Sequence, residues 1–236
     1  MIELSRRQFL GRMGVLYGSV SAGPVLWRRP GVIVGRPRAP RIGWGADPRT
    51  TLTVSWATTA PVRNPVVDDV RLYEKLCLEG FQSGLSWLTI LRKRDGFRRA
   101  FAGFEPEKVA AFDDGDVTRL LGDAGIVRHR GKIEAAIGNA RATLAVQADR
   151  GSLASLVWEH EPARRGRAVP VRLGDLAPQT VESVALSKAL RRYGFAFVGP
   201  TTAYAAMQSL GLVNDHLKGC HVRAACDQER RHITVR

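Results

Sequence analysis

Residues 120–133 read Leu-Leu-Gly-Asp-Ala-Gly-Ile-Val-Arg-His-Arg-Gly-Lys-Ile. The stretch joins two helical patterns through a short connection that contains glycine and ends in basic side chains. Glycine lets a backbone approach a phosphate closely, and the free amides at the start of the next helix face an anion. The pattern predicts a helix-hairpin-helix that contacts DNA phosphates through Gly125, Arg128, Arg130, Gly131 and Lys132. An ordinary turn between helices with a solvated basic face is the alternative.

Helical patterning extends from this hairpin in both directions. Asp68 or Asp69 can cap a first helix, and Gly80 and Gly84 bracket a break after it. Residues 132–147 carry an amphipathic pattern typical of a helix. Strand signals are nearly absent beyond the first 66 residues, and no repeat of fixed period is present. We therefore expect an all-α fold preceded by a poorly ordered N-terminal extension.

The chain is strongly basic, with a formal net charge of +14 over 236 residues. About half of this surplus lies in residues 1–41, so the rest of the chain is basic in its own right. Such a surplus attracts polyanions, which makes nucleic acid or an anionic membrane surface the expected class of partner. No run of about 18 apolar residues occurs, and we therefore expect no transmembrane helix.

The three cysteines, Cys77, Cys220 and Cys226, are too few and too irregularly spaced for a disulfide framework. They suit a reducing compartment, or a metal site shared with histidine. The N-terminus points elsewhere, because residues 5–10 read Ser-Arg-Arg-Gln-Phe-Leu and are similar to a twin-arginine export signal. Arg12 interrupts the apolar stretch that follows. A basic leader on a cytoplasmic, nucleoid-associated protein is the favoured interpretation, and export is the alternative.

Several longer blocks occur in one order along the chain. Together with the hairpin, they resemble the DNA-3-methyladenine glycosylase I family of the helix-hairpin-helix glycosylases. The resemblance spans about residues 68–220, and its blocks are residues 76–87 (LCLEGFQSGLSW), 125–132 (GIVRHRGK), 185–190 (ALSKAL), 197–204 (FVGPTTAY) and 211–216 (GLVNDH). It implies the helix-hairpin-helix glycosylase fold for this part of the chain.

The resemblance also implies an activity, the hydrolysis of the N-glycosidic bond of 3-methyladenine in alkylated DNA. This reaction begins base excision repair, and the expected partner is double-stranded DNA carrying an alkylated purine. By the motif match, Glu79 supplies a catalytic and base-binding carboxylate, and Trp87 supplies the aromatic face on which the base stacks. The family uses no catalytic aspartate, so none is assigned. Tyr204 lies in a family block and is equally suited to a core position.

A structural zinc ion is the cofactor that the resemblance implies. His216 and Cys220 match the family's C-terminal half-site, and the other half comes from an N-terminal cysteine and histidine. Ile42 stands where that cysteine belongs, and residues 49–62 contain neither histidine nor tyrosine. The zinc site is therefore expected to be incomplete, and aromatic residues that would line the pocket are missing. The abrupt onset of similarity suggests a disturbed reading frame upstream.

The resulting domain organisation has four parts. Residues 1–40 form a basic extension, 41–67 a degenerate family segment, 68–220 the helical glycosylase domain and 221–236 a C-terminal tail. We expect a monomer that does not bind membranes. The alternative function is a catalytically weakened or inactive helix-hairpin-helix module that binds DNA without releasing a base.

Overall fold

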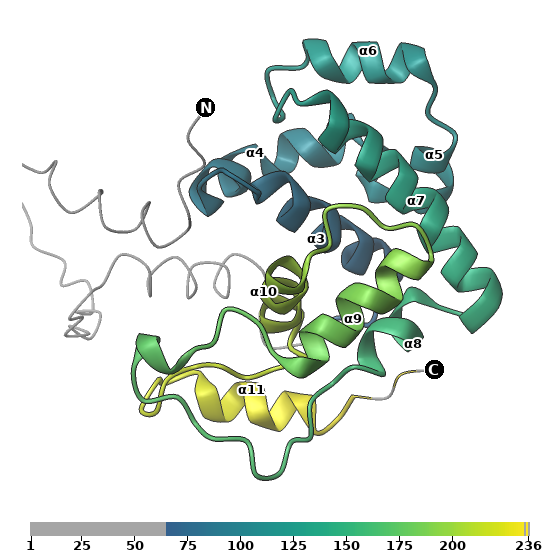
Figure 1. Cartoon of the computed structure of the whole chain (residues 1–236). Coiled ribbons are helices and arrows are strands. Elements are labelled where there is room, and N and C mark those ends of the chain that lie inside the picture. The colour runs from purple at the N-terminus through teal and green to yellow at the C-terminus, as the bar shows by residue number, and fades with distance from the viewer. Residues whose placement is uncertain (1–64, 234, 236) are drawn as a thin grey trace, which may run out of the picture. The chain divides into compact units, whose positions relative to one another are not determined.

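The computed structural model describes residues 65–233 and 235, and this part of the chain contains helices and no strand (Figure 1). The all-α prediction is therefore confirmed. In chain order the elements are α3 (Asp69–Gln82), α4 (Trp87–Ala100), η1 (Ala102–Phe104), α5 (Pro106–Ala110), α6 (Asp114–Gly122), α7 (Arg130–Arg150), α8 (Leu153–Trp158), η2 (Leu173–Asp175), α9 (Val181–Arg192), α10 (Pro200–Leu210) and α11 (Arg223–Arg230). None of these helices is both long and apolar enough to cross a bilayer.

Helix α3 is the centre of the fold, because it packs against α4, α7, α8 and α10. Every residue from 72 to 81 is buried, including Glu74, Lys75 and Glu79. Asp68 caps the helix by accepting a hydrogen bond from the Arg71 amide at 2.9 Å, as one of the two predicted caps required. A helix buried on all sides is a core element, so α3 fixes the position of each charged group that it carries.

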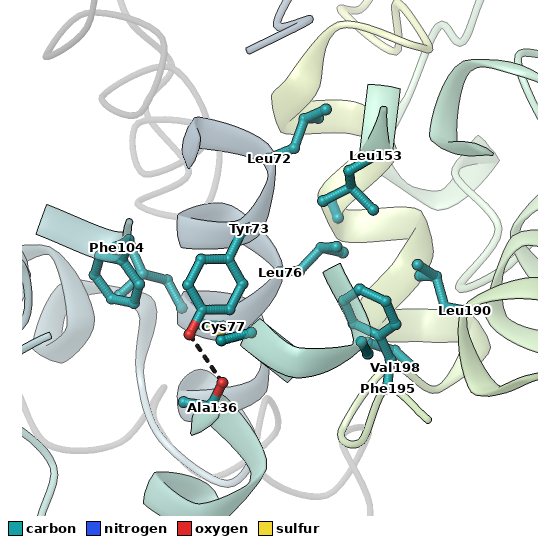
Figure 2. Packing of buried hydrophobic residues seen from close by; sticks show 14 of the residues in the cluster. Leu72, Tyr73, Leu76, Cys77, Phe104, Ala136, Leu153, Leu190, Phe195 and Val198 are labelled. Atoms are coloured by element: carbon teal, nitrogen blue, oxygen red, sulfur yellow. Dashed lines mark hydrogen bonds between the residues drawn. The ribbon is translucent and has the colours of Figure 1, made fainter. Parts of the chain in front are cut away.

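The core around α3 is rich in aromatic side chains. Tyr73 lies edge-on to Phe104, and its hydroxyl donates a 2.8 Å hydrogen bond to the Ala136 carbonyl of α7 (Figure 2). A buried hydroxyl needs such a partner. Figure 2 also shows Leu72 and Leu76 among side chains of α8, α9 and the segment that follows α9. The start of α3 is tied to α8 as well, because the Asp69 carboxylate accepts the Leu153 and Ala154 amides at 2.9 Å.

The structure corrects two details of the sequence analysis. Gly80 does not bracket a break but lies inside α3, where a Cβ would meet the Phe197 Cβ at 3.1 Å. The break falls at Gly84, which has a φ of 79°.

The predicted C-terminal tail contains α11, whose Arg230 donates to Glu161 at 2.8 Å and also to the Leu212 carbonyl. The basic extension, the twin-arginine-like segment and residues 41–64 lie outside the described residues.

The hairpin predicted at 120–133 is formed by α6 and α7, and it packs closely against α4. The contact is made by two glycines, since a Cβ built on Gly96 would lie 2.4 Å from the Gly125 carbonyl oxygen. Asp123 shapes the turn by accepting the Gly125 amide at 2.6 Å. The hairpin is therefore held by backbone-to-backbone packing that no larger residue at position 96 can reproduce.

We expect Gly96→Ala to destabilise the protein by about 1–3 kcal/mol, because the added methyl group overlaps backbone atoms that cannot rotate away. Gly138→Ala is the matched control: it also lies in a helix, and nothing lies within 4 Å of its added Cβ. This control should gain about 0.5–1 kcal/mol from helix propensity. Chemical denaturation measures both changes. Equal stability of the two variants would contradict the proposed close contact.

Candidate active site

The two residues predicted to bind a base, Glu79 and Trp87, lie against the same buried ammonium group. Lys75 Nζ is 2.5 Å from Glu79 Oε1 and 4.1 Å from the centroid of the Trp87 ring. Lys75 and Glu79 share one face of α3, one turn apart. Trp87 begins α4 after the Gly84 turn. The break between the two helices thus brings a carboxylate and an indole face to one point.

The charged groups around this point differ in how strongly the protein stabilises their charged form. Burial, helped by Arg94 and opposed by the Glu79 and Glu74 carboxylates, lowers the pKa of Lys75 to about 8. Burial raises the pKa of Glu74, but hydrogen bonds from Arg98 and Arg94 outweigh it and hold that pKa below its ordinary value. The point where Glu79 and Trp87 meet thus holds an ammonium group that can lose its proton a little above neutral pH.

The basic residues of the α6–α7 hairpin divide into two groups. Arg128 and Arg130 are exposed, and Arg130 makes a 3.3 Å surface ion pair with Glu134. Lys132 is only 8% exposed. Its ammonium donates to the Phe81 carbonyl at 2.9 Å and to the Ser83 carbonyl at 2.5 Å. Lys132 thus has a structural role, holding the end of α3 against the start of α7.

The backbone amides of the same hairpin are also partly used within the protein. The Gly125 amide is taken by Asp123, and the Lys132 amide donates to His129 Nδ1 at 3.3 Å, which caps α7. Gly131 lies in the first turn of α7, where a helix has no acceptors of its own for its amides. Gly131 with Arg128 and Arg130 is the part of the predicted set that the geometry leaves facing outward.

A second helical hairpin, formed by α9 and α10, lies beside the first. Asn139 of α7 clamps its connection, because its side chain donates to the Ala196 carbonyl at 3.2 Å and accepts the Ala196 amide at 2.7 Å. Phe197 at the tip has a φ of 57° and is 42% exposed. Gly199 caps α10 without a side chain, and Pro200 follows at the first helical position. The signal in the sequence was Gly-Pro at the start of a helix, which the sequence analysis read only as part of a family block.

Tyr204 is buried and belongs to a polar network of the core, one of the two roles that the sequence left open. Its hydroxyl donates to Asp215 Oδ2 at 2.6 Å and accepts from Arg167 at 2.9 Å. Gln208 and Arg167 complete the coordination of the Asp215 carboxylate at 2.8 and 2.7 Å. Burial raises the pKa of Asp215, but these hydrogen bonds outweigh it and keep that pKa below its usual value. The network holds the loop carrying Arg167 against α10.

The two residues of the predicted zinc half-site lie close together. Cys220 Sγ lies 3.6 Å from His216 Nδ1. Among the described residues no group of three or more histidine, cysteine or acidic side chains could hold a metal. The sequence before residue 65 contains no cysteine and no histidine. Because structural zinc takes four such ligands, these residues do not fit the ion.

Comparison with known proteins agrees with the helical fold. A family model described as methyladenine glycosylase matches residues 62–224. The chain is 48% identical over 156 residues to DNA-3-methyladenine glycosylase 1 of Escherichia coli (strain K12), covering 66% of this chain and 83% of that protein.

Solved structures extend the similarity to the fold. A crystal structure of 3-methyladenine DNA glycosylase I has a TM-score of 0.67 at 44% identity, and the match covers 72% of this chain and 93% of that chain. The Staphylococcus aureus enzyme, described in a structural study of 3-methyladenine recognition, has a TM-score of 0.65 at 36% identity, covering 68% and 85%. The match of the family model over more than half of the sequence shows that this chain belongs to the methyladenine glycosylase family.

Proposed function

We propose that this protein excises 3-methyladenine from alkylated double-stranded DNA and so begins base excision repair. The observation that carries the proposal is the position of the Glu79 carboxylate and the Trp87 ring against one buried ammonium. A site that accommodates a cation between these groups suits a purine made cationic by methylation. The Escherichia coli relative is named for this base, and the Staphylococcus aureus structure concerns its recognition, so both support the same substrate.

The chemistry asks little of the protein beyond extrusion and recognition of the base. Methylation at N3 places a positive charge on the purine, so its bond to the deoxyribose C1′ is already weakened. When this bond breaks, the electron pair stays with the base, which departs uncharged. Water adds to C1′ and loses a proton, leaving an abasic site. Glu79 accepts a hydrogen bond from the exocyclic amine, and Trp87 attracts the cationic ring by about 0.5–2 kcal/mol.

The two hairpins give this pocket a DNA-facing side. Arg128 and Arg130 are exposed on the first, and Phe197 is exposed on the second. The Lys132 hydrogen bonds place the first hairpin next to the Gly84 turn that precedes Trp87. Phosphate contacts of this kind position a duplex without reading its sequence. A weakly paired, damaged base then turns out of the stack at low cost.

The alternative function is a DNA-binding module that does not release a base. The missing N-terminal aromatic residues favour it, because they would help to enclose the base. We further propose a monomer that acts at the chromosome in the cytoplasm, where its substrate lies. Zinc is proposed to be dispensable, since His216 and Cys220 supply only half of a four-ligand site.

Glu79→Gln should lower the rate of 3-methyladenine release from methylated duplex DNA by about 10- to 100-fold, because a neutral amide oxygen replaces the charged acceptor of the cationic base. Trp87→Ala should also lower it, because the cation loses its aromatic face. Chromatography of the released bases measures both rates. Glu107→Gln, which changes an exposed carboxylate on α5, is the control. Duplex binding by the wild type without any base release would favour the alternative module.

Arg128→Ala and Arg130→Ala should each reduce the salt dependence of duplex binding by about 0.9 in the slope of log K against log salt. Lys132→Met should instead lower the free energy of unfolding by about 1–3 kcal/mol, because the Phe81 and Ser83 carbonyls lose their donor. Fluorescence anisotropy at several salt concentrations and chemical denaturation separate the two effects. A Lys132 variant that loses salt dependence and keeps its stability would return this residue to the DNA surface.

A zinc chelator should leave both the melting temperature and the rate of base release unchanged. Cys220→Ser should likewise have little effect, because the thiol is half-buried and belongs to no group of three metal-ligating side chains among the described residues. Differential scanning calorimetry with and without chelator makes the comparison. Stoichiometric zinc in the purified protein, with a melting temperature that falls on chelation, would show that other ligands complete the site.

A further inference from the structure

The ammonium of Lys75 lies where the proposed function places the cationic base. It is 2.5 Å from the Glu79 carboxylate and over the Trp87 ring, and Lys75 as a whole is only 4% exposed. We propose that Lys75 competes with the methylated base for one binding position. Its ammonium lies between the Glu79 carboxylate and the Trp87 ring, and a cationic purine binds there only when that ammonium moves away or loses its proton. This inference rests on the proposed function and adds a specificity-determining residue to it.

Electrostatics makes the two occupants mutually exclusive. A single carboxylate can neutralise one buried cation, and a second cation beside it remains uncompensated in a medium of low polarity. Glu79 is 6% exposed, so water does little to relieve that cost. Both occupants also require the same face of Trp87. A cationic base therefore cannot simply be added beside a charged Lys75.

Among the described residues, the charged groups that act on Lys75 lie on two helices. Glu79 and Glu74 lie on its own helix and favour its charge, whereas Arg94 of α4 opposes it. Helices α8 and α10, which also pack against α3, carry no ionisable acid or base except the Tyr204 hydroxyl. On α7, the Lys132 ammonium is turned to the Phe81 and Ser83 carbonyls.

Deprotonation of Lys75 is therefore one way to remove the competing charge from the binding position. Burial and Arg94 oppose the charge of Lys75, and its pKa falls to about 8. The form that can bind a cation is the one without the proton, so its share rises as the pH rises. For competition of this kind, apparent affinity is scaled by the share of the competent form. It should increase about tenfold between about pH 7 and about pH 9.

The test uses isothermal titration calorimetry of the full chain with 3,9-dimethyladeninium, a cation that reproduces the methylated base without its sugar. The wild type should bind more tightly as pH rises over this range. Lys75→Met should bind about tenfold more tightly than the wild type near pH 7, with no pH dependence, because the competitor is gone. Lys75→Arg should bind weakly throughout, because an arginine keeps its proton. Lys108→Met, which removes an exposed lysine of α5, should behave like the wild type.

The proposal is overturned if wild-type affinity does not change with pH, if Lys75→Met binds the cation more weakly than the wild type, or if no variant binds it. The wild-type and Lys75→Arg profiles decide the matter even if Lys75→Met does not fold. Base release from methylated DNA is measured in parallel. Base release that depends on Glu79 supports the proposed function, whatever the Lys75 variants show. If binding of the cation depends on pH but no base is released, the Lys75 proposal holds and the proposed function fails.

Discussion

A helix that is packed on every side can carry charge only where the charge is paired, and this constraint organises the molecule. On α3, Glu74 is held by Arg94 and Arg98 of α4, and Lys75 is held by Glu79. Unpaired, any of these groups would make burial of the helix unfavourable. The pairs therefore fix the rotation of α3 and its contact with α4. The same rotation turns the Glu79 carboxylate towards the ring that begins α4, so the core and the pocket share one arrangement.

Features set by residues close together in the sequence could be predicted from it, and features set by distant residues could not. The Asp68 cap and the short connection between the helices α6 and α7 were predicted correctly, because caps and turns are set by residues a few positions apart. Gly80 was misread as a break, since its neighbour Phe197 is distant in sequence. Lys75 was not identified, because a lysine in a helical pattern usually faces solvent. Its ammonium lies over the Trp87 ring, which only the packed structure brings near.

The hairpins show how a basic surface and a rigid scaffold are made from similar residues. Lys132 and Arg130 are two positions apart, yet one points into the protein and the other outwards. The separation follows from α7, in which residues two apart lie on different faces. A charge count along the sequence cannot distinguish such neighbours. The inward lysine joins α3 to α7, and this joint keeps the exposed arginines at a fixed distance from the pocket.

The first described residues are hydrogen-bonded to the end of α10 and to α8. The Val66 amide donates to the Leu210 carbonyl at 3.0 Å, and the Trp158 indole donates to the Val66 carbonyl at 2.9 Å. Gly211, with a φ of 85°, lies directly against Pro65, where a Cβ would come within 3.1 Å. Residues 65 and 66, which precede the first described helix, are thus held by contacts to later parts of the chain. Pro65 is therefore a suitable junction for chimeras, because a segment taken from a relative and joined ahead of it would connect to residues that are already held in place.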